Sequence, residues 1–355
     1  MKKLLASVLA LVMVFGLLAV SAAADNQLEL TEPIEFTMAT CWGTNDSAPN
    51  VGLDYFKKVV EGMSGGMITV NTAKGTLGAE RELIEDTQLG SIEACVTTTG
   101  PLGGFVPYTD IFMTPYLFKD RNHAYAACDG ALGQRMEELC EEVGLKVLDW
   151  QIVGTRNIYG VGNEIHTPED IVGKKIRVME TEMLVALYEH YGAIATPMAY
   201  NEVYSALQQN AIDGCQAGLP SVSVNHEEVS DWVAILDENI SVCPVMFNKD
   251  FWDGLPEAAK NIIDQAIKGA TVIVRQIDKD QDAMLIPIWE AAGCNVYYAD
   301  RDAFEAKARE IYPKFKEILD GDPEGWIDWV VALGEYFPAE GQIADEAYQA
   351  EVYCF

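Results

Sequence analysis

Strand-like and helix-like segments alternate along this chain, and the alternation limits the fold more than any other feature of the sequence. Residues 34–40 (IEFTMAT) have the composition of a strand, and residues 51–63 (VGLDYFKKVVEGM) have the spacing of an amphipathic helix. A strand at 67–73, a helix at 80–90 and an apolar strand at 92–100 follow in the same order. This β-α-β-α-β order predicts an α/β domain with a mostly parallel sheet.

A second unit of the same kind is predicted from about residue 154 to residue 240. A helical segment at 123–144 and strands at 145–162 lead into it. Its own elements are a strand at 175–178, helices at 180–192 and 201–210, and a strand at 212–218. Residues 256–293 form one helical region, and their length and periodicity predict a helix that runs across both domains. A strand at 294–299 and outer helices follow.

The first 24 residues have the pattern of a cleavable export signal. Lys2 and Lys3 precede an apolar run from Leu4 to Val20, and small residues at 22–24 form a cleavage motif. An uncleaved membrane anchor is the alternative, but the run is short for a membrane-spanning helix and ends in a good cleavage motif. We therefore expect a soluble protein outside the cytoplasm, with no later segment able to cross a bilayer.

Acidic side chains dominate the composition, with 55 Asp and Glu against 24 Lys and Arg and a formal net charge of −31. Such a surface repels nucleic acid and anionic membranes, so neither is an expected partner. An anionic ligand must then be held by local positive groups. Eight cysteines are scattered without a CxxC motif, so no disulfide framework is predicted, although a single bridge stays open.

Three features that suggest enzymes or metal sites have surroundings that favour other interpretations. The run Gly62-Met63-Ser64-Gly65-Gly66 matches GxSxG, but a helix precedes it and a strand follows, the reverse of a nucleophile elbow. This turn is predicted to end a helix. The run Gly160-Val161-Gly162 lacks the third glycine of a dinucleotide motif. The four histidines show no metal-ligand spacing, so no metal or cofactor is expected.

Two arginines, Arg156 and Arg177, frame one β-rich segment of this acidic chain and are the strongest candidates for a ligand site. Arginine is permanently charged, and its planar fork fits a carboxylate through two hydrogen bonds. Strand alternation puts Arg177 on the face opposite Ile176 and Val178, which also fits an exposed surface strand. The pattern alone leaves both interpretations open.

Several longer segments together resemble the substrate-binding subunit of tripartite ATP-independent periplasmic (TRAP) transporters. The resemblance covers about residues 35–270, and the part from Thr167 to Gly214 is the most specific. The segments that carry it are GTLGAERELIEDTQLGSIEA, MTPYLFKDRNHAYAACDGALG, GTRN, TPEDIVGKKIRV, GAIATPMAYNEVYSALQQNAIDG and FNKDFWDGLPEAAKNII.

The resemblance implies a two-lobed α/β fold like that of other periplasmic binding proteins, with a hinge, crossing strands and a long helix spanning both lobes. Lobe I is expected to comprise residues 30–153 and 241–280, and lobe II residues 154–240 and 281–325. Helices within 326–355 are expected to pack on the outside. Ligand is expected in a cleft between the lobes, which close around it.

The resemblance also assigns roles to individual residues. Arg177 matches the arginine that holds the ligand carboxylate, Arg156 matches a second pocket arginine, and Tyr200 matches an aromatic position beside the ligand. The first-lobe residues that are expected to face the cleft are Trp42, Asn45, Arg81 and Thr98.

One segment departs from the family pattern. After Asp213-Gly214 the family commonly has Gln-Glu-Asn-Pro, in which the Asn helps to hold the carboxylate. Here the run is Cys215-Gln216-Ala217-Gly218, so Ala217 stands at the Asn position. Gln216 is the candidate to take over that contact. Because both arginines remain, an organic acid is still the expected ligand.

The expected function is that of a non-enzymatic receptor, which captures a small organic acid and delivers it to ion-coupled TRAP membrane subunits. An exported two-lobed ligand sensor is one alternative, because only its partner would differ. An exported enzyme such as a hydrolase is the other, but it needs a nucleophile or an acid–base pair that the sequence does not offer in a supporting context. C4-dicarboxylates, keto acids, aromatic acids and sugar acids all fit the sequence as ligands.

Overall fold

The strands of the protein form one continuous mixed sheet. The computed structural model describes residues 30–219 and 224–337, and these contain nine strands in the order β2-β1-β3-β8-β4-β7-β5-β6, with β9 beside β8. Their bounds are β1 (Ile34–Thr40), β2 (Ile68–Lys74), β3 (Ala94–Val96), β4 (Leu145–Gly160), β5 (Lys175–Val178), β6 (Ile194–Pro197), β7 (Gly214–Gly218), β8 (Trp232–Asn248) and β9 (Asn295–Tyr298).

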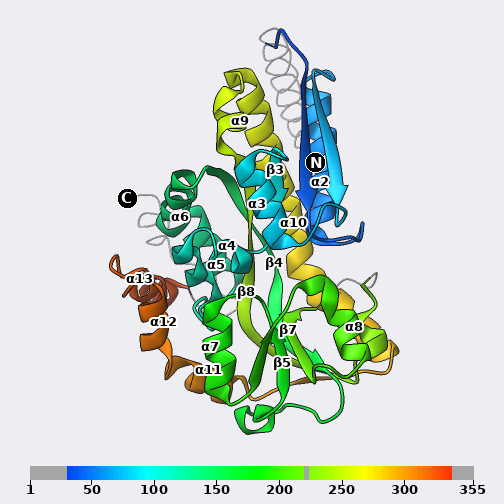
Figure 1. Ribbon diagram of the computed structural model, residues 1–355, viewed down its shortest axis with the longest axis vertical. Helices are drawn as coiled ribbons and strands as arrows, with labels where there is room; N and C mark the ends of the chain where they lie inside the picture. The colour runs from blue at the N-terminus through cyan, green and yellow to red at the C-terminus, as the bar shows by residue number, and fades with distance from the viewer. Residues whose placement is uncertain (1–29, 220–223, 338–355) are drawn as a thin grey trace, which may run out of the picture.

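Two long antiparallel strands, β4 and β8, connect the two ends of this sheet (Figure 1). The end of β8 pairs with β3 and the start of β4, whereas the start of β8 pairs with β9 and the end of β4. Most residues of both strands are buried, and long apolar runs such as the one at the end of β8 fit this burial. The crossing strands confirm the two-lobed fold class. The prediction of a mostly parallel sheet was incomplete, because the longest pairing is antiparallel.

Helices cover both faces of the sheet. Their bounds are α2 (Ala48–Met63), α3 (Glu80–Leu89), α4 (Thr99–Leu102), α5 (Arg121–Asp129), α6 (Ala131–Glu142), α7 (Glu182–Tyr191), α8 (Val203–Gln208), α9 (Lys249–Gly254), α10 (Glu257–Ala291), α11 (Arg301–Arg309), α12 (Tyr312–Ile318) and α13 (Trp326–Leu333). Short 3₁₀ turns lie at Pro107–Met113, Pro168–Ile171, Tyr200–Glu202, His226–Val229 and Gly334–Tyr336. In Figure 1, α5–α7 and α11–α13 lie on one side of the crossing strands, and α2, α8 and α10 lie on the other.

The apolar core is continuous on one face of the sheet and divided on the other. The cluster under α6, α7 and α11 joins side chains from both ends of the molecule, among them Leu132, Leu187 and Phe304. The opposite face carries two separate clusters, one around Phe36 and the other around Tyr159. The ligand site is therefore to be sought between the two separate clusters.

Helix α10 contributes to both of these separate clusters. Ile262, Ile263 and Ala266 near its start pack in the first cluster, whereas Leu285 and Trp289 near its end pack in the second. The helix has 35 residues. The expectation of one helix that runs across both lobes is confirmed.

Other predictions concern the connecting segments and the termini. The helix predicted at 123–144 is two helices, because Gly130 adopts an extended backbone between α5 and α6. The predicted strand at 92–100 is shorter, since α4 begins at Thr99.

The seven cysteines in the described ranges are free, and none of the helices described there is long and apolar enough to cross a membrane. The predicted export signal, Cys354 and residues 338–355 lie outside the described residues.

Candidate functional site

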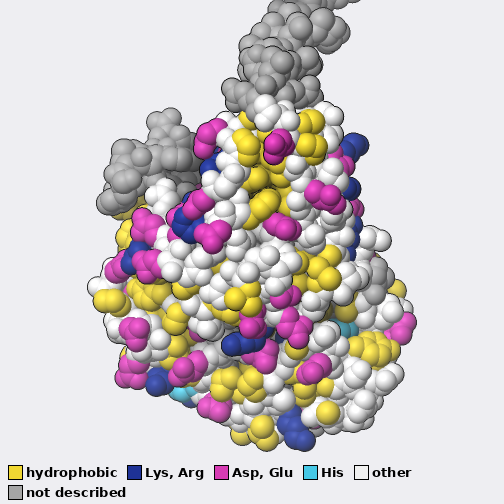
Figure 2. Space-filling view, turned by 45° about the horizontal axis from the view of Figure 1, so that its top comes forward, with side chains coloured by type: hydrophobic (Ala, Val, Ile, Leu, Met, Phe, Trp, Pro, Cys, Tyr) yellow, Lys and Arg dark blue, Asp and Glu magenta, His cyan; other side chains and the backbone are white. Residues whose placement is uncertain are grey.

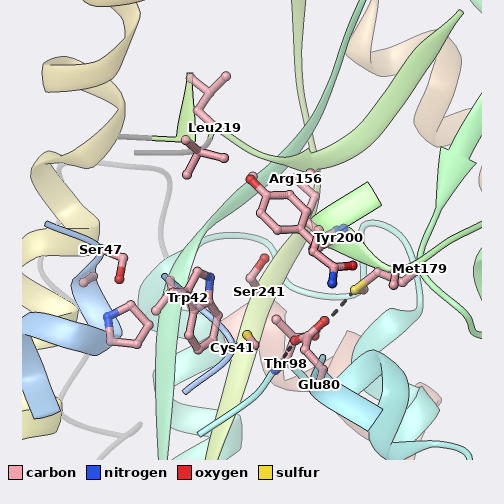
Figure 3. A pocket seen from close by; sticks show the side chains of 18 of the residues that line it. Cys41, Trp42, Ser47, Glu80, Thr98, Arg156, Met179, Tyr200, Leu219 and Ser241 are labelled. Atoms are coloured by element: carbon pink, nitrogen blue, oxygen red, sulfur yellow. Dashed lines mark hydrogen bonds between the residues drawn. The ribbon is translucent and has the colours of Figure 1, made fainter. Parts of the chain in front are cut away.

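A cavity of about 340 Å³ lies between the two separate clusters. It is lined from lobe I, from lobe II and from α10 (Figure 3). Seven of the nine residues that the resemblance singled out line it, and they are Trp42, Arg81, Thr98, Arg156, Arg177, Tyr200 and Ala217. The other two, Asn45 and Gln216, are placed differently.

Arg156 reaches the cavity from the end of β4, where it pairs in register with Gly218 of β7. Its side chain is anchored by one residue, since Nε donates to Gln216 Oε1 at 2.9 Å and Nη2 donates to the Gln216 carbonyl at 3.0 Å. Burial and the nearby charge of Arg177 lower the pKa of Arg156. Gln216 thus lies behind the arginine and holds it, outside the cavity lining.

Arg177 lies on β5, between β6 and β7, and is only 2% exposed. Its Nε donates to the Met198 carbonyl at 2.9 Å, and its Nη1 donates to the Gln216 carbonyl at 3.5 Å. The guanidinium carbon is 5.7 Å from the centre of the Tyr200 ring. The interpretation of an exposed arginine on a surface strand is therefore wrong, because strands on both sides and the chain around Met198 enclose the side chain.

Neither arginine forms an ion pair within the described ranges, although both are buried. Arg156 Nη1 and Arg177 Nη2 also make no hydrogen bond to a described residue, and both side chains line the cavity. A buried charge is costly unless a partner of opposite charge compensates it. The site is consequently built to receive an anion.

A buried carboxylate stands behind Arg156. Glu238 of β8 is fully buried, and its Oε2 accepts hydrogen bonds from Gln216 Nε2 at 3.0 Å and from Tyr188 Oη at 3.2 Å. Burial raises the pKa of Glu238 to about 7. Sequence reasoning missed this residue, and the only signal was the acidic pair Asp237-Glu238 within a long strand.

A second carboxylate missed by sequence reasoning, Glu80 at the start of α3, lines the cavity from lobe I. Its Oε1 accepts hydrogen bonds from the Thr98 backbone N at 2.8 Å and from Thr98 Oγ1 at 2.7 Å. Thr98 Oγ1 also lies 3.5 Å from the Met179 sulfur, which connects the two sides of the cavity. Neighbouring Arg81 is exposed at the rim, with its guanidinium 5.4 Å from the Phe105 ring centre.

Tyr200 lies on a 3₁₀ turn and is supported by a buried histidine. The His226 ring centre lies 5.3 Å from that of Tyr200, and its Nδ1 is 2.8 Å from Tyr159 Oη. Burial and Arg177 lower the pKa of His226 to about 4, so this ring is neutral at neutral pH. Tyr200 is thus held as one fixed aromatic surface of the cavity.

The remaining candidates differ in position. Trp42 follows β1 and is half-buried, and Ala217 presents only a methyl group beside the arginines. Asn45 is exposed, does not line the cavity and accepts a hydrogen bond from Lys74 Nζ at 3.2 Å. Ser64 of the GxSxG run caps the end of α2, and its Oγ accepts from the Ile68 backbone N at 3.0 Å. The predicted helix-ending turn is confirmed.

Comparisons with known proteins agree with this geometry. The sequence profile of bacterial extracellular solute-binding proteins, family 7 (DctP), matches residues 38–318. A solute-binding protein of Verminephrobacter eiseniae is 34% identical over 276 residues, which cover 77% of this chain and 82% of that protein.

Two solved structures show the same fold. A TRAP periplasmic solute-binding protein from Polaromonas sp. JS666, bound to D-erythronate, has 30% identity and a TM-score of 0.80 over 84% of this chain and 98% of its own. One from Sulfurospirillum deleyianum with bound succinate has 25% identity and a TM-score of 0.78 over 85% and 99%. The chain therefore belongs to the bacterial extracellular solute-binding proteins of family 7, the solute-binding subunits of TRAP transporters.

Proposed function

We propose that this protein is an extracytoplasmic receptor that captures a small organic acid in the cavity and delivers it to ion-coupled TRAP membrane subunits. The observation that carries the proposal is the pair of buried arginines, Arg156 and Arg177, which line the cavity without an ion partner among the described residues. The relatives solved with D-erythronate and succinate support an acid as the ligand.

The ligand carboxylate would lie between the free prongs of the two arginines. Backbone and amide oxygens already orient each guanidinium, so little side-chain freedom is lost when the acid binds. Because the arginines are buried, the charge-assisted hydrogen bonds form in a medium of lower polarity than water and are stronger there.

The proposal includes no chemical conversion of the ligand. Among the residues that line the cavity, Thr98, Ser241 and Cys41 carry hydroxyl or thiol groups, and Thr98 already donates its hydroxyl to Glu80. Burial and the adjoining Glu80 raise the pKa of the Cys41 thiol, so the thiolate nucleophile is disfavoured.

Thermal unfolding against a panel of organic acids tests the proposal. An acid at about 100 times its dissociation constant should add roughly 2.7 kcal/mol to the stability. The Arg177→Ala variant should lose this stabilisation, and Arg177→Lys should recover only part of it, because lysine lacks the planar fork.

Arg309→Ala is the matched control, because Arg309 is an exposed arginine of α11 that pairs with Glu305 and does not line the cavity. It should leave the ligand-induced shift unchanged. Stabilisation that survives in Arg177→Ala would place the site elsewhere, and no stabilisation by any acid would contradict the proposed function.

A further inference from the structure

The cavity has two chemically different halves. The charged side chains Arg156, Arg177 and Glu80 lie on one side, together with the buried Ser241 hydroxyl of β8. Figure 3 shows Arg156, Glu80 and Tyr200 grouped on the side away from α10, with Leu219 and Trp42 between them and that helix.

The half beside α10 is apolar. Ile277, Met284, Leu285 and Ile288 line the cavity from this helix, and their spacing places them on one helical face. Gln281 is the polar residue on the same face, and its Nε2 already donates a hydrogen bond to the Leu219 carbonyl at 3.2 Å. The described residues of this half therefore offer a ligand hydroxyl few hydrogen-bond partners.

The charges in the other half of the cavity determine how many carboxylates the ligand carries at its polar end. Arg156 and Arg177 carry two positive charges and Glu80 one negative charge, so one ligand carboxylate brings the enclosed charge close to balance. The rim charges of Asp46, Arg81 and Glu180 are exposed to water and are therefore screened. A dicarboxylate would add a second negative charge beside Glu80 without a buried cation to match it.

Glu80 also determines which group the ligand needs beside its own carboxylate. Glu80 accepts hydrogen bonds from Thr98 and from the Cys41 thiol. An ionised carboxylate has about four acceptor sites, so Glu80 can accept a further hydrogen bond from the ligand. A hydroxyl group supplies this donor without changing the charge balance. Ala217, at the position where the family has an amide, adds no competing polar contact.

On the basis of the proposed function, we infer that the ligand is an amphipathic hydroxy monocarboxylic acid, with a branched aliphatic or aromatic tail against α10. Its carboxylate binds Arg156 and Arg177, and its hydroxyl donates to Glu80. A sugar acid of similar length binds more weakly, because each hydroxyl buried without a partner lowers affinity by about tenfold or more.

Isothermal titration of the purified protein with four acids tests this inference. The acids are 2-hydroxy-3-phenylpropanoate, 3-phenylpropanoate, D-gluconate and succinate. We expect the first to bind at least tenfold more tightly than the other three. Glu80→Ala should cost the hydroxy acid about tenfold in affinity and should cost 3-phenylpropanoate, which lacks the hydroxyl, much less.

A variant pair on α10 tests the apolar half. Ile277→Gln should weaken binding of 2-hydroxy-3-phenylpropanoate several-fold, whereas Val272→Gln, at an exposed position of the same helix outside the cavity, should not. Tighter binding of gluconate or succinate than of the hydroxy acid would overturn the inference and leave the proposed function standing. If none of the four acids binds, and if Arg177→Ala abolishes the binding of no other acid, both the inference and the proposed function are overturned.

Discussion

Neutral groups, rather than carboxylates, hold the two arginines of the cavity in position. Arg156 is bound by the side chain and carbonyl of Gln216, and Arg177 by the carbonyls of Met198 and Gln216. A carboxylate in direct contact would have satisfied the arginines and competed with the ligand. The nearest fully buried acid on this side, Glu238, acts one residue further back, through Gln216.

Glu238 should make the stability of the protein depend on pH. Its pKa is about 7 in the folded protein and 4.5 ordinarily, so the folded state keeps a proton that the unfolded state releases. Stability is therefore lost as the pH rises from about 4.5 to 7, by about 3 kcal/mol at most. Glu238→Gln should reduce this loss, measured as the difference between the unfolding free energies in urea at pH 5 and pH 8.

The exposed Glu189 of α7 offers the matched control, since Glu189→Gln should leave the pH dependence unchanged. Some loss will remain in Glu238→Gln, because burial also raises the pKa of Asp110 to about 7. An unaltered difference between pH 5 and pH 8 in Glu238→Gln would contradict the assignment.

The residues of the site were predictable from sequence to different degrees. Arg156 and Arg177 could be found because an arginine pair in an acidic chain is unusual and because the surrounding segments resemble a known family. Glu80 could not, since an acid in the first turn of a helix is ordinary. The position of Asn45 depended on the turn after β1, which places its side chain beside Lys74 instead of the cavity.

Among the elements, α10 is hydrogen-bonded to the crossing strand β4 where the sheet passes between the lobes. Asp278 of α10 accepts hydrogen bonds from the Gly154 backbone N at 2.5 Å, from Arg121 Nε at 3.0 Å and from Tyr125 Oη at 3.0 Å. Gly154 has a φ of +84°, and β4 has an irregular register there. If the lobes move, we expect the bending to occur at this irregularity, because the register of β4 shifts between Ile152 and Thr155.

Two glycines in helices should respond to alanine in opposite directions. A Cβ at Gly133 of α6 would lie 1.7 Å from the Cys128 carbonyl oxygen, so Gly133→Ala must displace backbone and should destabilise the protein by about 1–3 kcal/mol. A Cβ at Gly62 of α2 would meet nothing within 4 Å. Gly62→Ala should therefore stabilise by roughly 0.5–1 kcal/mol, because glycine is a poor helix former.

Urea unfolding of the two variants measures both effects, and each variant is the control for the other. A stable Gly133→Ala protein would mean that α5 and α6 separate easily. The same close approach explains why the prediction of one helix at 123–144 was wrong. Periodicity continues through Gly130, whereas the break depends on how tightly the two helices pack, which the sequence pattern does not express.

For the whole molecule, the surface charge opposes the entry of an anionic ligand. Acidic side chains are spread over the face shown in Figure 2, with fewer basic ones between them, as expected for a net charge of −31. We therefore expect the association rate constant of an organic acid to rise several-fold between about 10 and 150 mM salt, as screening weakens the repulsion.

Stopped-flow fluorescence provides the measurement, because Trp42 lines the cavity. Sucrose at matched osmolality should not reproduce the effect of salt. An association rate that falls with salt would show that the field of the two arginines outweighs that of the surface.

The divided core also determines when the chain can fold during its synthesis. The cluster around Phe36 needs side chains as far apart as Leu30 and Ala270, and the cluster around Tyr159 needs Cys294. Neither can be completed by the part of the chain that is made first, and long-range pairing of this kind is slow. We therefore expect both clusters to stay incomplete until most of the chain has left the ribosome, which would leave the nascent polypeptide extended enough to be threaded through an export channel.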